Sequence, residues 1–390
     1  MAIVHLTRGR HRAQEGHPWV FAGEIETIGG DFAPGDLVTV VDHRGRFVGR
    51  GFINPASLIR VRLLTHRDER VDDDFWLARL RAAWELRRSF RAESAFRVVF
   101  AESDGLPGLV VDRFGPWLVM QTLALGVDVR RDFLVEALGS LTGCTGVFLR
   151  NDAPVRELEG LPLESGPAPG TPPDLPTRVE VTEGDVHLWV DVAEGQKTGH
   201  FLDQRFNRAA AARLAPGARV LDAFSYTGGF AIHAARAGAR EVLAIEASAW
   251  AVGLARENAE LNGVADRCRF QEGNAFDLLR TLDQERERFD LVILDPPAFA
   301  RSREALEGAL RGYKEINLRA LHLLNPGGYL VTSSCSSHLD PDTFLGVVAG
   351  AARDAGRRVL VLEARGQPPD HPVLLGYPES RYLKCLICRT

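Results

Sequence analysis

The feature that most constrains this chain is the alternation of short apolar runs with amphipathic stretches between residues 215 and 365. Helical spacing of apolar residues predicts helices between the apolar runs, for example at 248–262 and 305–324. The runs themselves predict strands at 219–223, 241–246, 268–270, 289–295, 328–333 and 358–362. Strands that alternate with helices form a mostly parallel sheet covered on both faces. The sequence therefore predicts an α/β fold, a doubly wound Rossmann-like domain over residues 178–390 that opens with a hairpin at 178–192.

Two further segments precede this domain, as a length of 390 residues allows. Residues 1–70 place turn residues between β-prone runs such as 37–41 and 57–63, which predicts a small β-barrel or sheet. Residues 72–177 predict a compact central α+β domain. Its expected helices and strands lie at 72–91, 97–100, 109–112, 117–122, 129–141 and 146–150. The proline-rich stretch 162–176 that ends this domain is interpreted as an exposed linker or long loop.

Composition excludes several classes of protein. The net charge of -5 argues against coating nucleic acid by charge alone, although a local basic face remains open. Only three of the 47 basic residues are lysines, namely Lys197, Lys314 and Lys384. No apolar run approaches the roughly 18 residues of a membrane helix. Five cysteines do not make a disulfide framework, and we see no export signal. We therefore expect a cytoplasmic protein without a membrane partner.

Acidic residues end three of the predicted strands: Asp222, Glu246 and Asp295. Ligands of doubly wound sheets bind beyond these strand ends. The turn 222–230 holds two glycines but lacks the G-x-G-x-x-G spacing of a pyrophosphate site. An acid such as Glu246 can bind ribose hydroxyls, and carboxylates favour a sulfonium cation. This pattern indicates S-adenosylmethionine, with the loop 273–277 at the adenine edge. The alternative is an α/β domain without a nucleotide, whose acids only cap helices.

Six motifs together resemble the RlmI-like family of ribosomal RNA methyltransferases. They are Gly195–Arg205, Phe224–Phe230, Asp295–Phe299, Arg311–Asn317, Ser334–Ser336 and Asp370–Val373. The resemblance covers nearly the whole chain and implies an N-terminal PUA domain, a central α+β domain and a class I methyltransferase domain. It also implies a role in rRNA processing, the formation of 5-methylcytosine in 23S ribosomal RNA of the large subunit. A homodimer and the identity of the modified nucleotide stay open.

The resemblance also implies a set of cofactor-binding residues. By motif match these are Lys197, Gln204, Asp222, Phe224, Ser225, Tyr226, Thr227, Gly228, Glu246, Asn274, Ala275 and Asp295. Lys197 and Gln204, which precede the first strand, are expected to close over the cofactor. Family members commonly have Asp at the position of Glu246, and the longer acid still reaches a ribose.

The proposed chemistry needs a cysteine, because carbon 5 of cytosine is a poor nucleophile until a thiolate adds to carbon 6. Cys335 follows the strand 328–333, where the hydroxyls of Ser333, Ser334, Ser336 and Ser337 are expected to surround it with donors. The alternative is a buried, inert cysteine. Asp295 is expected at the N3 or N4 edge of the cytosine. The base that removes the carbon-5 proton is unassigned, because Pro297 stands where many RNA cytosine methyltransferases have a second cysteine.

Other interpretations also remain open. The motif Asp295–Phe299 suits an RNA N-methyltransferase, which needs no cysteine, and a non-catalytic ribosome assembly factor is a further alternative. Phe299 either stacks on a flipped base or packs in the core. Cys385 and Cys388 cannot build a four-ligand zinc site, and we expect no metal. RNA contact is expected from the N-terminal segment, or else its charges form a solvated face; its basic and aromatic residues include Arg8, Arg10, Arg12, His17, Trp19, Arg44 and Arg62.

Overall fold

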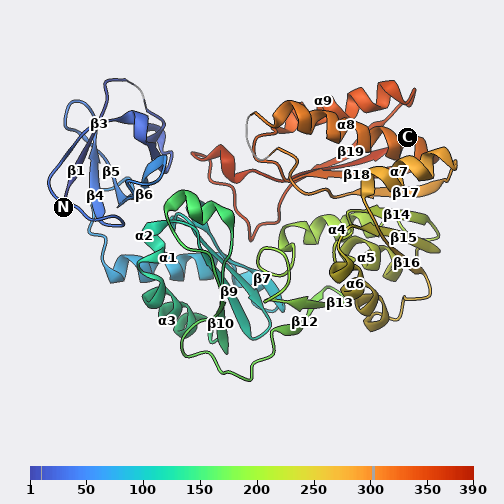
Figure 1. Ribbon diagram of the computed structural model, residues 1–390, viewed down its shortest axis with the longest axis horizontal. Helices are drawn as coiled ribbons and strands as arrows, with labels where there is room; N and C mark the ends of the chain where they lie inside the picture. Colours follow the sequence, from blue (N-terminus) through green and yellow to red (C-terminus); the bar gives the residue numbers. More distant parts are fainter. Residues whose placement is uncertain (10, 301–303) are drawn as a thin grey trace. The chain divides into compact units, whose positions relative to one another are not determined.

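The computed structural model describes residues 1–9, 11–300 and 304–390; Arg10, expected to contact RNA, lies outside them. The chain divides into two compact units (Figure 1). The first unit comprises Met1–Val181, Val190–Leu202 and Pro369–Ser380, and the second comprises Thr182–Trp189, Asp203–Pro368 and Arg381–Thr390. Each unit is thus assembled from segments that are distant in the sequence.

The first unit begins with a six-stranded sheet of order β2-β6-β5-β4-β1-β3, drawn in blue in Figure 1. Most neighbours pair antiparallel, whereas β1 and β4 are parallel. Alternate side chains such as Val4, Val38 and Val61 form its core, because successive side chains of a strand point to opposite faces. The strands are β1 (Ile3–Leu6), β2 (Trp19–Phe21), β3 (Ile25–Gly29), β4 (Leu37–Val41), β5 (Phe47–Ile53) and β6 (Ile59–Thr65).

A second sheet of the first unit has the order β11-β10-β9-β8-β7. Helix α1 (Asp73–Leu86) packs on β7 and on α3 (Arg131–Thr142), and the short α2 (Leu125–Asp128) precedes α3. Asp72 caps α1, because its side chain accepts the Phe75 N–H at 3.1 Å. The strands are β7 (Ala95–Phe100), β8 (Leu109–Phe114), β9 (Trp117–Thr122), β10 (Gly146–Asn151) and β11 (Glu164–Pro167).

The proline-rich stretch is exposed over most of its length, as an exposed linker or long loop should be, but part of it also packs on this second sheet. Strand β11 pairs antiparallel with β10, and the buried Ala168 donates its N–H to the Val147 carbonyl at 2.8 Å. The Trp117 indole donates to the Pro176 carbonyl at 2.8 Å. An edge strand is hydrogen-bonded on one side only, so it tolerates residues without an N–H donor.

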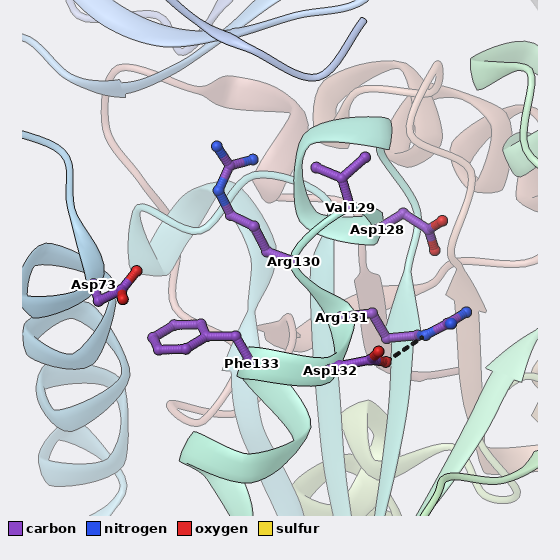
Figure 2. A pocket seen from close by; sticks show the side chains of 7 residues that line it. All are labelled: Asp73, Asp128, Val129, Arg130, Arg131, Asp132 and Phe133. Atoms are coloured by element: carbon purple, nitrogen blue, oxygen red, sulfur yellow. Dashed lines mark hydrogen bonds and ion pairs between the residues drawn. The ribbon is translucent and has the colours of Figure 1, made fainter.

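The first unit has a hollow of about 460 Å³ at the start of α3, which Figure 2 shows. Four of the charged groups that line it have protein partners. Asp128 accepts from Arg156 at 2.9 Å, and Arg130 donates to the Gly126 carbonyl at 2.6 Å. Arg131 bonds the neighbouring Asp132 at 3.3 Å. We attribute these charges to the local structure of the α2–α3 corner and not to a ligand.

The second unit contains a seven-stranded sheet of order β16-β15-β14-β17-β18-β20-β19. The first five of these are parallel neighbours, whereas β20 is antiparallel to both β18 and β19. The strands are β14 (Arg219–Ala223), β15 (Glu241–Glu246), β16 (Cys268–Glu272), β17 (Phe289–Leu294), β18 (Leu324–Ser334), β19 (Leu360–Arg365) and β20 (Lys384–Arg389). The hairpin expected before them consists of β12 (Arg178–Glu183) and β13 (Val186–Asp191). The doubly wound α/β prediction is therefore confirmed.

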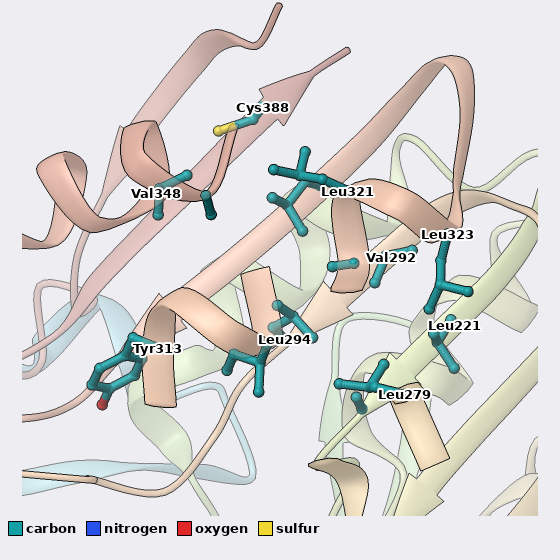
Figure 3. Packing of buried hydrophobic residues seen from close by; sticks show 14 of the residues in the cluster. Leu221, Leu279, Val292, Leu294, Tyr313, Leu321, Leu323, Val348 and Cys388 are labelled. Atoms are coloured by element: carbon teal, nitrogen blue, oxygen red, sulfur yellow. The ribbon is translucent and has the colours of Figure 1, made fainter. Parts of the chain in front are cut away.

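Helices cover both faces of this sheet (Figure 1). One face carries α4 (Arg205–Ala212), α5 (Gly229–Arg236) and α6 (Ala249–Leu261). The other face carries α7 (Ala275–Gln284), α8 (Leu306–Leu323) and α9 (Pro341–Asp354). Their apolar side chains pack on the sheet, as Figure 3 shows for Leu279, Leu321 and Val348. Within the described ranges, no helix has the length and apolar character that crossing a membrane requires.

Candidate active site

Four neighbouring strands of the second unit carry a reactive or acidic side chain where they end. Asp222 and Glu246 lie at the ends of β14 and β15. Asp295 directly follows β17, and Cys335 directly follows β18. Because the order is β15-β14-β17-β18 and all four strands are parallel, these groups form a row along one edge of the sheet. Open α/β sheets bind their ligands at this edge.

Asp222 is fully buried within this row. Its Oδ2 accepts the Ala231 N–H of α5 at 2.9 Å, whereas its Oδ1 has no hydrogen-bond partner among the described residues. Burial, together with the carboxylates of Asp295 and Glu246, raises the pKa of Asp222 well above its usual value. A cationic group beside Asp222 would relieve this repulsion and supply a partner for Oδ1. The acids at this edge thus fit a sulfonium or ammonium ligand.

The turn after β14 is held in a strained conformation. Phe224 has φ 67° and Tyr226 has φ 49°, backbone angles that residues other than glycine rarely adopt. Gly228 has φ 84°, and a Cβ there would lie 3.1 Å from Ile232 and 3.2 Å from Ala255. Such strain costs about 1–3 kcal/mol for each residue and gathers at ligand sites. The buried Ser225 Oγ is a second polar atom of this edge without a partner among the described residues.

Glu246 fixes the same turn. Its Oε2 accepts the Tyr226 N–H at 2.8 Å, and its Oε1 accepts the Ser248 N–H at 2.9 Å. The interpretation of the acids as helix caps is right in part for Asp222, whose Oδ2 accepts from the first turn of α5. Glu246 instead bonds the turn after β14 and the N–H of Ser248, which itself caps α6. Each carboxylate oxygen has two acceptor positions, so both oxygens keep one for the hydroxyls of a ribose.

Two other predicted cofactor residues lie at the start of α7. The side chain of Asn274 caps this helix, because its Oδ1 accepts the Phe276 N–H at 2.9 Å. Its amide N–H groups have no acceptor among the described residues. Ala275 is the buried first residue of the helix. Asn274 can therefore donate to a ligand at the end of β16.

Gln204 joins the row, whereas Lys197 belongs to the first unit. Gln204 is buried, and it donates from Nε2 to Asp295 Oδ1 at 2.6 Å. Its Oε1 accepts from Asn207 at 2.6 Å. Lys197 lies in Val190–Leu202 with its Nζ 4.9 Å from the centre of the Phe201 ring. Its place at the cofactor stays a prediction.

The loop around Cys335 is held by the hydroxyl of Tyr313, which lies on α8 and is fully buried. Ser334 Oγ donates to this hydroxyl at 3.0 Å, and Ser336 Oγ lies 3.0 Å from it. Ser334 therefore donates to Tyr313 and not to Cys335, whereas donation to Cys335 from the other serines stays a prediction. Ser334 and Ser336 both contact the Tyr313 hydroxyl. Because they flank the cysteine and both turn to Tyr313, they fix the backbone on either side of it.

Cys335 itself faces the loop that follows β17. It is half-buried, and its Sγ contacts the Pro296 carbonyl oxygen at 3.9 Å. The sulfur thus lies next to the Asp295–Phe299 motif. The structure does not place it deep in the apolar core, where an inert cysteine would belong.

A cluster of aromatic rings connects the cofactor turn with the Cys335 loop. The Phe299 ring lies 6.3 Å from Phe224, 5.5 Å from Phe276 and 4.6 Å from Tyr313, measured between ring centres. Of the two interpretations of Phe299, packing is the one with observed contacts, and stacking on a base stays a prediction. Tyr313 lies in the motif Arg311–Asn317, but the sequence does not indicate which groups its hydroxyl contacts.

Comparison with known proteins identifies the family. Residues 4–66 match the model of a PUA-like domain, and residues 172–388 match that of an S-adenosylmethionine-dependent methyltransferase. The ribosomal RNA large subunit methyltransferase I of Erwinia tasmaniensis is 43% identical, with 98% of each chain covered. The protein of that name from Aeromonas hydrophila is 42% identical, with 100% of this chain and 99% of its own covered. This chain belongs to the ribosomal RNA large subunit methyltransferase I family.

Membership in the methyltransferase I family confirms the resemblance, the PUA-like and methyltransferase domains, and S-adenosylmethionine as cofactor. A solved structure from Streptococcus mutans, described as an S-adenosylmethionine-dependent methyltransferase, covers 100% of both chains with a TM-score of 0.85 at 18% identity. SMU.776, a methyltransferase solved with SAH, has the same TM-score of 0.85 at 19% identity. These two structures support the fold alone.

In this methyltransferase I relative, several N-terminal residues expected to contact RNA have other roles. Arg62 is buried and bonds both Glu102 and Glu159 at 3.0 Å. The Trp19 indole donates to Glu102 at 2.8 Å, and His17 is buried. These three residues therefore do not lie on a solvated basic face, whereas Arg8 and Arg44 are exposed.

The remaining cysteines do not suggest a second centre. Burial raises the pKa of Cys385 and that of Cys388 to about 12, and both lie in β20. Burial also raises the pKa of Cys268 to about 12. In the described part of the chain, no three His, Cys, Asp or Glu side chains are grouped as metal ligands.

Proposed function

We propose that this protein methylates carbon 5 of a cytosine in large-subunit ribosomal RNA, with Cys335 as the nucleophile. The observation that carries the proposal is the position of the Cys335 sulfur, 3.9 Å from the Pro296 carbonyl at the edge that holds three acids. The RNA class comes from the relatives, which are named ribosomal RNA large subunit methyltransferase I. The PUA-like domain is proposed to contact that RNA.

The cofactor, when bound, supplies an electrophilic methyl group on a sulfonium. In the proposed site, Asp222 favours the cationic part of the ligand and Glu246 accepts from the ribose hydroxyls. Asn274 donates to the adenine edge, and Gly228 leaves room for the chain that joins these groups. Lys197 is proposed to close over the ligand.

In the proposed reaction, the Cys335 thiolate adds to carbon 6 of the cytosine, so that an Sγ–C6 bond forms and an electron pair becomes available at carbon 5. Carbon 5 gains the methyl group as the bond between that group and the sulfonium sulfur breaks, which leaves a neutral thioether. Carbon 5 then loses its proton to a base that is unassigned. The electrons of that C–H bond restore the 5,6 double bond as the Sγ–C6 bond breaks and the thiolate returns. Asp295 is proposed to hold the N3–N4 edge of the base, and the hydrogen bond from Gln204 fixes its carboxyl group.

The test is nucleoside mass spectrometry of ribosomal RNA incubated with the enzyme and labelled cofactor. We expect 5-methylcytosine from the wild type and from the control C144A, whose thiol is half-buried in the first unit. The variant C335A should give none. Full turnover by C335A with an amine-methylated product would favour the N-methyltransferase alternative. An absence of cofactor binding by calorimetry would favour a ribosome assembly factor.

A further inference from the structure

Lys384 is a buried lysine next to the Cys335 loop, and no carboxylate bonds it. It is 4% exposed, and its Nζ donates to the carbonyls of Ser336 at 2.6 Å and Tyr382 at 2.8 Å. An ammonium has three donors, and the described residues accept only two of them. Both acceptors are neutral. Lys384 thus places an unneutralised positive charge inside the protein.

The fold brings this charge to the same sheet edge as the thiol. Lys384 is the first residue of β20, which runs antiparallel to β18 and pairs it with Ser334. Cys335 follows Ser334 directly. The ammonium also bonds the carbonyl of Ser336, the residue after the cysteine. Lys384 therefore bonds the residue after Cys335 through its side chain and pairs with the residue before Cys335 through its backbone.

Few charged groups act on this ammonium. Burial lowers the pKa of Lys384 to about 8, and the charges that oppose this are those of Cys335 and Asp340. Asp340 is exposed and is engaged with Thr343 as the cap of α9. Other titratable groups at the loop are Tyr313, which bonds Ser334 and Ser336, and the exposed His338. Asp295 precedes Pro296, whose carbonyl Cys335 contacts. Burying an ion without a countercharge is unfavourable, so a negative group that forms here would be stabilised.

We propose that Lys384 is a positioning residue that stabilises the thiolate of Cys335, by its charge and by its hold on the Ser336 carbonyl. Only the catalytic use of this thiolate rests on the proposed function; its stabilisation by Lys384 does not. The thiol proton passes to solvent, and the ammonium keeps its own proton while it favours the anionic sulfur. The same charge favours release of the sulfur from carbon 6, because the leaving group departs as a thiolate.

The test is the pH dependence of Cys335 alkylation by iodoacetamide in the full-length protein, with each cysteine resolved by peptide mass spectrometry. We compare the wild type with K384M and with the matched control K314M, since Lys314 pairs with Asp354 at the surface at 2.7 Å. We expect K384M to react about tenfold more slowly at pH 7, with its profile displaced to higher pH by about one unit. K314M should match the wild type, and K384R should recover part of the rate.

An unchanged Cys335 profile in a folded K384M would overturn the proposal. If K384M does not fold, the wild type alone decides: a Cys335 profile with its midpoint at or above the ordinary thiol value of about 8.5 overturns it as well. Alkylation requires neither RNA nor turnover. Full methylation activity of C335A would therefore contradict the proposed function. It would not affect the alkylation result, which tests the role of Lys384 separately.

Discussion

Each unit contains a buried cluster of charged residues, and the pKa of the central carboxyl group is shifted in opposite directions in the two clusters. In the first unit, Arg62 bonds Glu102 and Glu159, and Glu159 also accepts from Ser57 at 2.7 Å. Burial opposes ionisation of Glu159, but Arg62 and its hydrogen bonds lower the pKa below the usual value. In the second unit, burial and two neighbouring carboxylates raise the pKa of Asp222.

This difference distinguishes charged groups that stabilise the fold from charged groups that are suited to bind a ligand. A carboxyl group whose pKa is lowered on folding adds stability above its unfolded pKa, and that stability is lost as the pH falls through the folded value. A carboxyl group whose pKa is raised on folding does the reverse, so it subtracts stability as the pH rises. Glu159 belongs to the first kind and Asp222 to the second. A ligand cation would change the balance for Asp222 alone.

The largest expected effect is the loss of Arg62. The variant R62M leaves Glu102 and Glu159 buried without their cation, and breaking a buried pair in this way costs about 3–5 kcal/mol. We expect urea denaturation, followed by the fluorescence of the first unit, to show that loss, while calorimetry shows unchanged cofactor affinity. The exposed Arg44 gives the control R44M. A loss below about 1 kcal/mol would contradict the assignment of this cluster to the fold.

The next effect is opposite in sign. D222N keeps an oxygen for the Ala231 N–H but removes the repelled charge, so we expect the ligand-free protein to gain about 1 kcal/mol of stability. The same variant should bind S-adenosylmethionine at least tenfold more weakly. Thermal unfolding with and without the cofactor measures both. Loss of stability in the ligand-free variant would show that Asp222 belongs with Glu159.

A smaller effect concerns pH. Since the folded pKa of Asp222 is raised, the group is protonated at low pH and becomes an anion only as the pH rises. The affinity for S-adenosylmethionine should therefore increase with pH more steeply than that for S-adenosylhomocysteine, which lacks the sulfonium charge. Calorimetry of both ligands across the same pH series checks this. Parallel slopes for the two ligands would count against a cation-binding role.

Sequence patterns predicted what is local. The run 219–223 matches β14 residue for residue, because the strand ends where the turn residues begin. The positions of Glu246, Asp295 and Cys335 at one edge follow from the same parallel pattern. Long-range pairing escaped prediction. Arg62 pairs with Glu102 and Glu159, which lie 40 and 97 residues away along the chain. No sequence pattern predicts pairs so far apart.

The same limit explains the missed residues of the Cys335 loop. Lys384 reaches the loop only because β20 inserts antiparallel between β18 and β19, and its sequence signal was no more than the rarity of lysine in this chain. The pairing of β11 within the proline-rich stretch 162–176 was not predicted, because composition reports the absence of N–H donors, whereas an edge strand needs few of them. The alternation of strand and helix predicts an edge, but not which distant side chain occupies it.

The last prediction asks whether the Tyr313 hydroxyl serves the fold or the active site. Y313F removes the partner of Ser334 and Ser336 but keeps the ring against Phe299, so it should cost about 1 kcal/mol. Because the loop on both sides of Cys335 then loses its tether, we expect kcat to fall about tenfold while KM stays nearly constant. The control is Y329F, since Tyr329 lies in β18 of the same unit. A stability loss of about 1 kcal/mol with unchanged kcat would assign the hydroxyl to packing, and would place it with Arg62 in the first kind of cluster.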